Sequence, residues 1–501
     1  MILTRGWPAL AAAALAGAIT AFGQAPYELA FLLVLGLSAV VWLAQSRVTS
    51  WQAALTGWAF GTGYFAHALQ WIVSPFLVDA ARHGWMAPFA LIFLAAGLAL
   101  FWGLAFWVAR RLHPTSLWPL VLTWPAVELL RAYVFTGFPW AMPAQAMVNT
   151  HSGQLLALVG PYGLNLIVIA LAVLIGRSNR GSGTRSAVEA VLGAGLAVAI
   201  LFPFYAPEAA LSDKVIRLIQ PNAAQRDKWD PDQVPVFFDR QLRYTAALPE
   251  GGGPPPDLVL WSETAIPWVL DLADGALMEI AEAAGDATVA LGVQRRDPGA
   301  YFNSMVVLGQ GGAVAQIYDK HHLVPFGEYM PFSDLMARIG IFGLAQRARG
   351  GYASGVGPKL LDFGPLGRAL PLICYEAVFA HDVNAAPERP DFLVQITNDA
   401  WFGKGAGPRQ HLAQARMRAI EQGLPLARAA NTGISAMIDP KGRVLASLPL
   451  NMAGFVDASL PKPLAPTFYS RTGDWPFAFV LLLGLAATAF RARRRQQRFS
   501  D

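Results

Sequence analysis

Residues 86–108 read MAPFALIFLAAGLALFWGLAFWV and contain no charged side chain. A helix over this stretch is roughly 34 Å long, which is enough to cross the hydrocarbon core of a bilayer. Further apolar stretches of this kind lie at residues 7–22, 29–43, 51–73, 117–134, 155–175, 187–204 and 475–490. The sequence therefore predicts a membrane α-helical bundle of about eight transmembrane helices.

Charged residues are distributed unevenly along the chain. Residues 1–205 hold nine Arg, no Lys and four acidic residues, whereas the remaining 296 residues hold 58 of the 71 charged side chains. We expect an N-terminal transmembrane domain of seven helices over 1–205, a polar domain over 206–473, and a transmembrane helix with a basic tail over 474–501. With 54% hydrophobic and 14% charged residues, the composition excludes disordered and collagen-like proteins.

Arginines in the short loops predict the orientation of the chain in the membrane. Only Arg82 lies on one side of the predicted membrane, and twelve arginines lie on the other, namely Arg5, Arg47, Arg110, Arg111, Arg177, Arg180, Arg185, Arg491, Arg493, Arg494, Arg495 and Arg498. Basic loops stay in the cytoplasm. We therefore expect both termini to be cytoplasmic and the polar domain to lie outside. Because the positive charge gathers beside the membrane, we expect no nucleic-acid partner.

Two opposite charges stand inside a predicted transmembrane helix, in the string PAVELLRAYVFTGFPW at residues 125–140. Glu128 and Arg131 are three residues apart, so they can pair on one helix face. Charges within a membrane are costly, which makes them candidates for function. The pair either ties this helix to its neighbours or contacts a lipid headgroup.

After residue 214 the sequence changes to short β-branched runs separated by turns and helical segments: VIRLIQPN, DLVLWSET, ATVALGVQ, YFNSMVVLG, ALPLICYE and DFLVQITND. This alternation predicts an α/β layered domain. Polar residues follow directly after several of these runs. Active sites of α/β folds usually lie at such strand ends.

Three of these strand ends carry reactive side chains: Glu263, Lys320 and Cys374. Cys374 is the only cysteine, so the polar domain contains no internal disulfide. A thiolate is a nucleophile, a nearby ammonium favours the thiolate and stabilises an oxyanion, and a carboxylate accepts and returns the proton. The three residues together therefore predict attack of a cysteine on a carbonyl.

Four segments, WSETAIPW, YDKHHLVPFGEYMP, LICYE and ARAANTGISAMIDPKGRV, resemble the nitrilase (carbon–nitrogen hydrolase) superfamily over about 240 residues. That resemblance implies a catalytic Glu, Lys and Cys on an αββα sandwich. With the predicted helices and the GFPW string, the whole chain resembles the apolipoprotein N-acyltransferase family. This resemblance implies a multi-pass enzyme of the bacterial inner membrane whose catalytic domain is periplasmic.

The resemblance also implies a ping-pong acyl transfer. Cys374 would take a fatty acyl chain from a phospholipid, typically the sn-1 chain of phosphatidylethanolamine, and form a thioester. The α-amine of the diacylglyceryl-cysteine of a lipoprotein would then attack the thioester and form an amide. By resemblance Glu263 is the general base, Lys320 the oxyanion stabiliser and Cys374 the nucleophile. No metal or other cofactor is expected, and we expect a monomer.

Further residues match positions of the family's site. By resemblance Glu328 positions Lys320, although a solvated turn carboxylate is the alternative. Tyr375 and Glu376 follow the nucleophile, where the backbone amide after Cys374 could donate to the oxyanion, or the two residues could serve in packing. Asn303 and Trp229 would line the site or pack. His321 and His322 are adjacent, so on an extended segment they point to opposite faces and cannot both enter one site.

Two glycine-containing apolar loops suggest how lipid arrives. One covers residues 331–358 and contains Phe342, and the other covers 400–407 and contains Trp401 and Phe402. We expect them to dip into the outer leaflet as a mobile lid, with a satellite core as the alternative.

Two other functions stay open at this point. One is a membrane-tethered nitrilase-type amidase, which shares Glu263, Lys320 and Cys374 but lets water resolve the thioester. The other is a non-enzymatic transporter or scaffold with an inactive outer domain.

Overall fold

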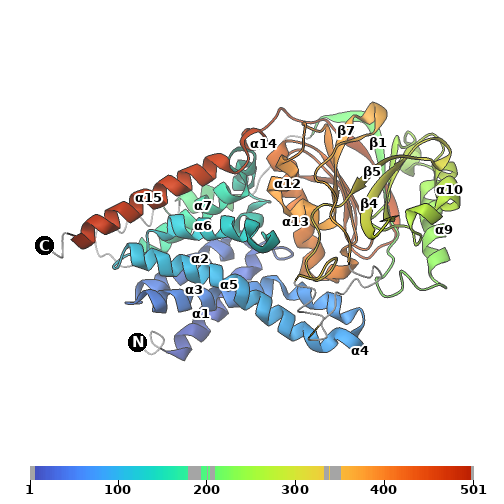
Figure 1. The fold of residues 1–501 in the computed structure, drawn as a ribbon. Coiled ribbons are helices and arrows are strands. Elements are labelled where there is room, and N and C mark those ends of the chain that lie inside the picture. The colour runs from blue at the N-terminus through green and yellow to red at the C-terminus, as the bar shows by residue number, and fades with distance from the viewer. Residues whose placement is uncertain are drawn as a thin grey trace. The chain divides into compact units, whose positions relative to one another are not determined.

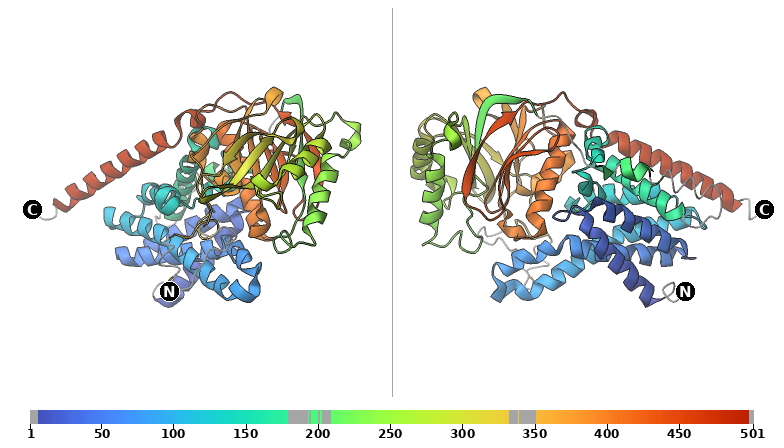
Figure 2. Two further views of the ribbon diagram at one scale, coloured as in Figure 1. Left: turned by 45° about the vertical axis from the view of Figure 1, so that its right-hand side comes forward. Right: turned by 180° about the vertical axis from the view of Figure 1, so that it is seen from behind.

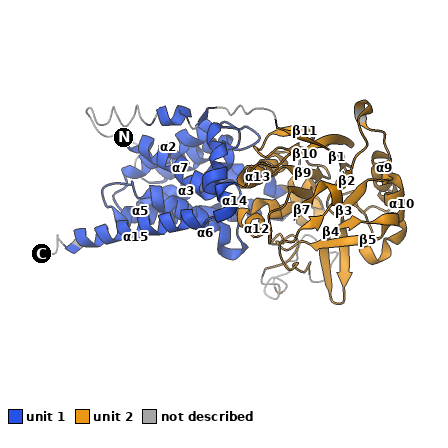
Figure 3. Ribbon diagram, turned by 90° about the horizontal axis from the view of Figure 1, so that it is seen from above, with its two compact units in different colours: residues 1–73, 85–206, 467–501 blue, residues 74–84, 207–466 orange. Residues whose placement is uncertain are grey.

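The computed structural model (Figure 1) describes residues 6–178, 193, 195–199, 201–202, 209–331, 338 and 351–497. The chain divides into two compact units (Figure 3). Residues 1–73, 85–206 and 467–501 form the first unit, and residues 74–84 and 207–466 form the second. Each unit has a distinct architecture, helical in the first and mixed α/β in the second.

The first unit consists of helices. Its main elements are α1 (Trp7–Thr20), α2 (Ala30–Gln45), α3 (Ser50–Ala68), α5 (Ala87–Leu112), α6 (Leu120–Tyr133), α7 (Leu156–Ser178), α14 (Phe468–Thr472) and α15 (Trp475–Gln497). α1 and α3 approach closely at two glycines. A Cβ added at Gly17 would lie 1.9 Å from the carbonyl oxygen of Phe60, and one at Gly63 would lie 1.8 Å from that of Ala14. Small residues let apolar helices pack through their backbones, as in other membrane proteins.

Three helical segments among the described residues are long and apolar enough to cross a membrane: Ala80–Leu112, His151–Arg177 and Trp475–Arg495. Two more apolar helices, Trp7–Gly23 and Ala30–Gln45, are shorter. α6 has 14 residues, and most of the expected span at 187–204 lies outside the described residues. The expected number of eight transmembrane helices therefore stays a prediction.

The charges in α6 form a buried ion pair. Arg131 Nη2 lies 2.7 Å from Glu128 Oε2, and the two side chains are 1% and 0% exposed. Glu128 also accepts a hydrogen bond of 2.7 Å from the Trp102 indole of α5, and Arg131 donates to the carbonyl oxygens of Phe138 and Trp140. The pair thus ties α6 to α5 and to the GFPW string. A lipid headgroup would need an accessible charge, which this pair does not offer.

Over its described residues, the second unit is a sandwich of two six-stranded sheets. The first sheet has the order β12-β1-β2-β3-β4-β5, with β1 (Leu211–Gln220), β2 (Leu258–Leu260), β3 (Thr288–Asp297), β4 (Ala300–Leu308), β5 (Val314–Asp319) and β12 (Gly454–Pro461). The second has the order β11-β10-β9-β8-β7-β6, with β6 (Leu361–Asp362), β7 (Arg368–Ile373), β8 (Phe392–Thr397), β9 (Leu426–Ala430), β10 (Ser435–Ile438) and β11 (Val444–Leu448). The two sheets face each other, with β1 against β9 and β10.

Helices cover the outer faces of the sheets (Figures 1 and 2). α9 (Val234–Thr245) and α10 (Asp274–Ala284) pack on the first sheet, around a core that includes Trp261 and Leu277. α12 (Ala380–Asn384) and α13 (Ala406–Gln422) pack on the second, around a core that includes Leu372 and Ala415. The predicted αββα sandwich is therefore present.

Strand direction determines where the reactive residues meet. β1, β2 and β3 run parallel to one another, as do β7, β8 and β9. In the second sheet Ile373 pairs with Ile396, so Cys374 and Thr397 lie side by side at the carboxyl ends of β7 and β8. Loops from both sheets converge there, because Asn398 after β8 donates to Glu263 after β2.

Candidate active site

The structure brings Glu263, Lys320 and Cys374 together in a buried site of the second unit. They are 6%, 1% and 5% exposed. Lys320 Nζ lies 3.7 Å from Glu263 Oε1, and the thiol of Cys374 interacts electrostatically with both partners. Strand ends more than 50 residues apart in sequence thus form one cluster.

Glu263 is held by two hydrogen bonds. Asn303 Nδ2 donates to its Oε1 at 2.6 Å, and the backbone N–H of Asn398 donates to its Oε2 at 2.8 Å. Space for this loop requires a glycine on the neighbouring strand, since a Cβ at Gly292 would lie 2.6 Å from Glu263 Cα. The carboxylate is therefore fixed in one orientation, and Asn303 lies in the site as the sequence suggested.

Glu328 lies against Lys320. The Lys320 ammonium is 2.9 Å from Glu328 Oε2, and the glutamate side chain is only 11% exposed. Asn303 Nδ2 also donates to Glu328 Oε1, at 3.0 Å, and Val324 N donates to its Oε2, at 2.8 Å. A solvated turn carboxylate does not fit this burial. Although burial opposes it, the charges of Glu328 and Glu263 raise the pKa of Lys320, so the side chain is an ammonium.

Cys374 begins the short 3₁₀ helix Cys374–Val378 with a left-handed backbone, φ 51°. This conformation costs a non-glycine residue free energy, and it persists only where neighbours enforce it. Glu376 is one such neighbour. Its Oε2 accepts from the N–H of Ile373 at 2.7 Å, and its Oε1 accepts from the Tyr318 hydroxyl at 2.7 Å and from His321 N at 2.8 Å.

The resting state of Cys374 differs from the simplest expectation of a thiolate. Burial and the Glu263 carboxylate raise the pKa of the Cys374 thiol, and Lys320 lowers it by less. Lys320 lowers the pKa of the thiol, as the sequence predicts, but burial and Glu263 raise it by more. Cys374 is therefore a thiol at rest, and a base must take its proton before it attacks.

The side chains of the histidine pair do not point as the sequence predicts. His321 and His322 follow β5 in a segment that is not extended, and both rings reach the same carboxylate. Asp382 Oδ2 lies 3.6 Å from His321 Nε2 and 2.7 Å from His322 Nδ1. The expectation that the two rings face opposite sides is wrong, because strand alternation does not apply there. Tyr375 packs edge-on against His322, with ring centroids 5.6 Å apart.

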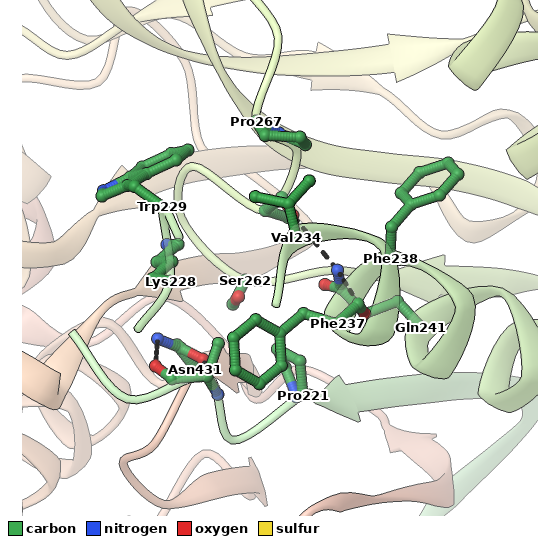
Figure 4. A pocket seen from close by; sticks show the side chains of 12 residues that line it. Pro221, Lys228, Trp229, Val234, Phe237, Phe238, Gln241, Ser262, Pro267 and Asn431 are labelled. Atoms are coloured by element: carbon green, nitrogen blue, oxygen red, sulfur yellow. Dashed lines mark hydrogen bonds between the residues drawn. The ribbon is translucent and has the colours of Figure 1, made fainter. Parts of the chain in front are cut away.

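Trp229 lines a small pocket together with Lys228 and Ser262 (Figure 4). The pocket measures about 20 Å³, room for about one water molecule. Next to Trp229 lies Lys228, whose Nζ donates to the Glu263 carbonyl oxygen at 3.1 Å and to Thr264 Oγ1 at 3.2 Å. Burial lowers the pKa of Lys228 to about 8, although Glu263 opposes the fall. Sequence reasoning missed Lys228 because it stands eight residues beyond the end of β1 and not directly after a strand.

The second lid loop is packed differently from the expectation. Phe402 is 8% exposed, and its ring lies edge-on against His411 with centroids 5.4 Å apart. The expected exposure of Phe402 is therefore wrong, since the side chain belongs to the interior of the second unit. Trp401 is half-buried. Phe342 and most of its loop lie outside the described residues.

Comparison with known proteins covers both units. The family model described as apolipoprotein N-acyltransferase N-terminal domain matches residues 16–174, and the carbon-nitrogen hydrolase model matches 242–465. A Rhodopseudomonas palustris protein named apolipoprotein N-acyltransferase is 37% identical, with 98% of this chain and 97% of that protein aligned. A protein of the same name from Bradyrhizobium diazoefficiens is 38% identical, with 99% of this chain and 96% of that protein aligned. A nitrilase-superfamily amidase from Nesterenkonia AN1 aligns with 53% of this chain and 97% of its own at 20% identity and TM-score 0.38.

Proposed function

This chain belongs to the apolipoprotein N-acyltransferase family, and from that premise we propose that Cys374 carries the transferred acyl chain as a thioester. The enzyme is an acyltransferase of lipoprotein maturation, so its substrates are a phospholipid and a lipoprotein. The finer proposal concerns which atoms do the chemistry. The observation that supports it best is the ammonium of Lys320, which lies between Glu263 and Glu328 at 3.7 and 2.9 Å beside the buried thiol.

The first half-reaction begins at the ester carbonyl of a phospholipid. Glu263 takes the proton of the Cys374 thiol, and the sulfur attacks the carbonyl carbon. The oxyanion that forms is stabilised by Lys320 and by the backbone N–H of Tyr375. Collapse breaks the ester C–O bond, the lysophospholipid alkoxide takes the proton from Glu263, and the acyl chain stays on sulfur.

The second half-reaction uses the same groups in turn. The neutral α-amine of a diacylglyceryl-cysteine attacks the thioester carbonyl, and Glu263 takes a proton from the attacking nitrogen. Collapse breaks the C–S bond, an amide forms, and the proton on Glu263 returns to the thiolate. Ester to thioester is close to balanced and thioester to amide runs downhill, so the sequence of steps needs no further energy source.

The charge balance of the site supports this order. Burial and the charge of Glu263 outweigh Lys320 at the Cys374 thiol and raise its pKa. This balance opposes a free thiolate and favours proton transfer to a carboxylate at the moment of attack. Glu328 takes the closest contact of the Lys320 ammonium, which leaves Glu263 available as the base.

The donor is proposed to be phosphatidylethanolamine, used at its sn-1 chain. The decisive experiment incubates purified enzyme with vesicles in which either the sn-1 or the sn-2 chain is labelled, with and without a diacylated lipopeptide. We expect label on Cys374 without the lipopeptide, and in an amide with it, from the sn-1 label only. Labelled free fatty acid in place of the amide would support the hydrolase alternative, and a Cys374→Ala enzyme that still forms the amide would refute the thioester.

We also propose that both termini are cytoplasmic and that the second unit is periplasmic, in agreement with the asymmetry of the arginines. Cys374 is the only cysteine, so Cys374→Ala gives a background for single-cysteine labelling. In spheroplasts a membrane-impermeant maleimide should label Leu248→Cys, a position 87% exposed in the second unit. It should label Gln497→Cys only after permeabilisation. The reverse pattern would overturn this topology.

A further inference from the structure

A glutamine lies in the middle of a buried strand next to the nucleophile. Gln395 is the fourth residue of β8, FLVQIT, and is fully buried between β7 and β9. A buried amide destabilises the fold unless its hydrogen bonds are made. Gln395 Nε2 donates to the carbonyl oxygen of Cys374 at 3.2 Å, and its Oε1 accepts from Arg428 Nη1. The side chain therefore links the nucleophile to a second charged group.

That second group is a buried network around Asp399. Arg428 Nη2 donates to Asp399 Oδ2 at 2.6 Å, and His411 Nδ1 lies 2.8 Å from Asp399 Oδ1. All three side chains are at most 1% exposed. Although burial opposes it, Arg428 and His411 lower the pKa of Asp399 to about 2. The carboxylate is thus ionised and accepts a hydrogen bond on both oxygens.

The network fixes which way the Gln395 amide points. Burial and the Arg428 charge lower the pKa of His411, and its Nε2 lies 3.0 Å from the Cys374 carbonyl oxygen, so His411 and Gln395 both contact that oxygen. Arg428 carries only N–H donors, so the amide oxygen of Gln395 must face it. With Arg428 on the amide oxygen and the Cys374 carbonyl on the amide nitrogen, only one orientation of Gln395 satisfies both partners.

Gln395 acts on a peptide that the reaction needs. A trans peptide is planar, and its C=O and N–H point in opposite directions. Holding the Cys374 carbonyl toward β8 therefore turns the N–H of Tyr375 to the other side of the chain. The left-handed backbone of Cys374 is strained, and rotation of this peptide would replace an N–H with a carbonyl oxygen.

We propose that Gln395, oriented by Arg428, is a positioning residue that together with His411 fixes the Cys374–Tyr375 peptide so that its N–H faces the acyl oxyanion. This inference rests on the proposed transfer through Cys374. It assigns Gln395 a role in both half-reactions, because each passes through a tetrahedral oxyanion.

The test compares two reactions of the same thiol. Iodoacetamide alkylates Cys374 by direct displacement and forms no oxyanion, whereas a fluorescent phospholipid acylates it through one. Gln395→Glu keeps the shape and the acceptor for Arg428 but replaces the donor to the Cys374 carbonyl with an oxygen. We expect acylation to fall about 100-fold, the cost of a lost oxyanion donor, while alkylation is unchanged and KM stays constant.

The chain offers a matched control on α13. Gln414 is 3% exposed, and neither its oxygen nor its nitrogen has a hydrogen-bond partner among the described residues. Gln414→Met should leave both reactions unchanged. If Gln395→Glu unfolds, His411→Ala serves instead, because it removes the other side-chain contact to the Cys374 carbonyl and leaves Arg428 and Asp399 paired. We expect the same selective loss of acylation, but a smaller one.

An equal loss of acylation and alkylation, or no loss of acylation, would overturn the role of Gln395. Failure of the proposed function looks different. In that case the unaltered enzyme itself would be alkylated by iodoacetamide but not acylated by phospholipid.

Discussion

The ammonium of Lys320 lies 2.9 Å from the carboxylate of Glu328, and both side chains are buried. This contact neutralises one of the two glutamates that face the lysine. The second, Glu263, is held by hydrogen bonds from Asn303 and from the Asn398 backbone. Lys320 lies closer to Glu328 than to Glu263, at 2.9 against 3.7 Å, so Glu263 is the less tightly paired carboxylate and the better proton acceptor for the thiol.

Glu263→Gln should slow both reactions of Cys374. The amide preserves the shape of the side chain but cannot take a proton, and the thiol is protonated at rest because of its raised pKa. We expect acylation by phospholipid and alkylation by iodoacetamide both to fall, by about 10²–10⁴-fold. The ratio of the acylation rate to the alkylation rate distinguishes this variant from Gln395→Glu, because Gln395→Glu should lower acylation alone. Alkylation at the unaltered rate would show that another group takes the proton.

Lys320→Met should reduce both activity and stability. The lost oxyanion donor lowers acyl transfer by about 10²–10³-fold, and the unpaired carboxylates cost about 3–5 kcal/mol of the free energy of unfolding. Adding Glu328→Gln should recover much of the stability without the activity. Thermal unfolding in detergent and the vesicle assay measure the two effects. A double variant as unstable as Lys320→Met would show that Glu328 does not depend on the lysine.

Lys228→Met should stabilise the protein at pH 7. The unfolded chain keeps its lysine protonated to about pH 10.4, whereas the pKa of the buried Lys228 is about 8. Between these values the unfolded state binds more protons, so stability of the unaltered protein rises with pH. The gain in the free energy of unfolding from Lys228→Met should therefore be largest at and below pH 8 and shrink toward pH 10. A gain in stability that does not change with pH would contradict a buried charge at Lys228.

Trp401→Ser and Phe402→Ser should have different effects. Phe402 is packed against His411, so its loss should cost on the order of 3 kcal/mol of the free energy of unfolding. Trp401 is half-buried, and its loss should lower acylation by vesicles while the unfolding temperature stays nearly unchanged. Acylation by a detergent-soluble ester is the control, since it does not require lipid capture. Equal loss of stability in both variants would refute the distinction.

Arg131→Met should destabilise the first unit by about 3–5 kcal/mol, because Glu128 would keep a buried, unpaired charge. Replacing both residues with Met should restore most of that stability. If the ion pair serves only to hold α6, the double variant keeps its acyl transfer. A double variant that is stable but has lost acyl transfer would show that the pair acts on the substrate.

Much of the architecture could be predicted from the sequence because the signals are local. Apolar length and missing charge predict membrane helices such as α5, and short β-branched runs ahead of Glu263, Lys320 and Cys374 predict strands that place reactive groups at their ends. The short helices α1, α2 and α6 were harder, since a helix of 14 or 16 residues can be apolar yet too short to span. Segment boundaries depend on packing, which composition does not describe.

The identity of the reactive side chains and the membrane character of the chain were thus determined by the sequence itself. Only the tertiary structure decided that Cys374 is a thiol at rest, that Phe402 is an interior side chain, and that Gln395 holds the nucleophile's peptide. The reason is physical. Residue type and hydropathy belong to each position, whereas burial, charge balance and hydrogen-bond partners arise only when strands distant in sequence pack against one another.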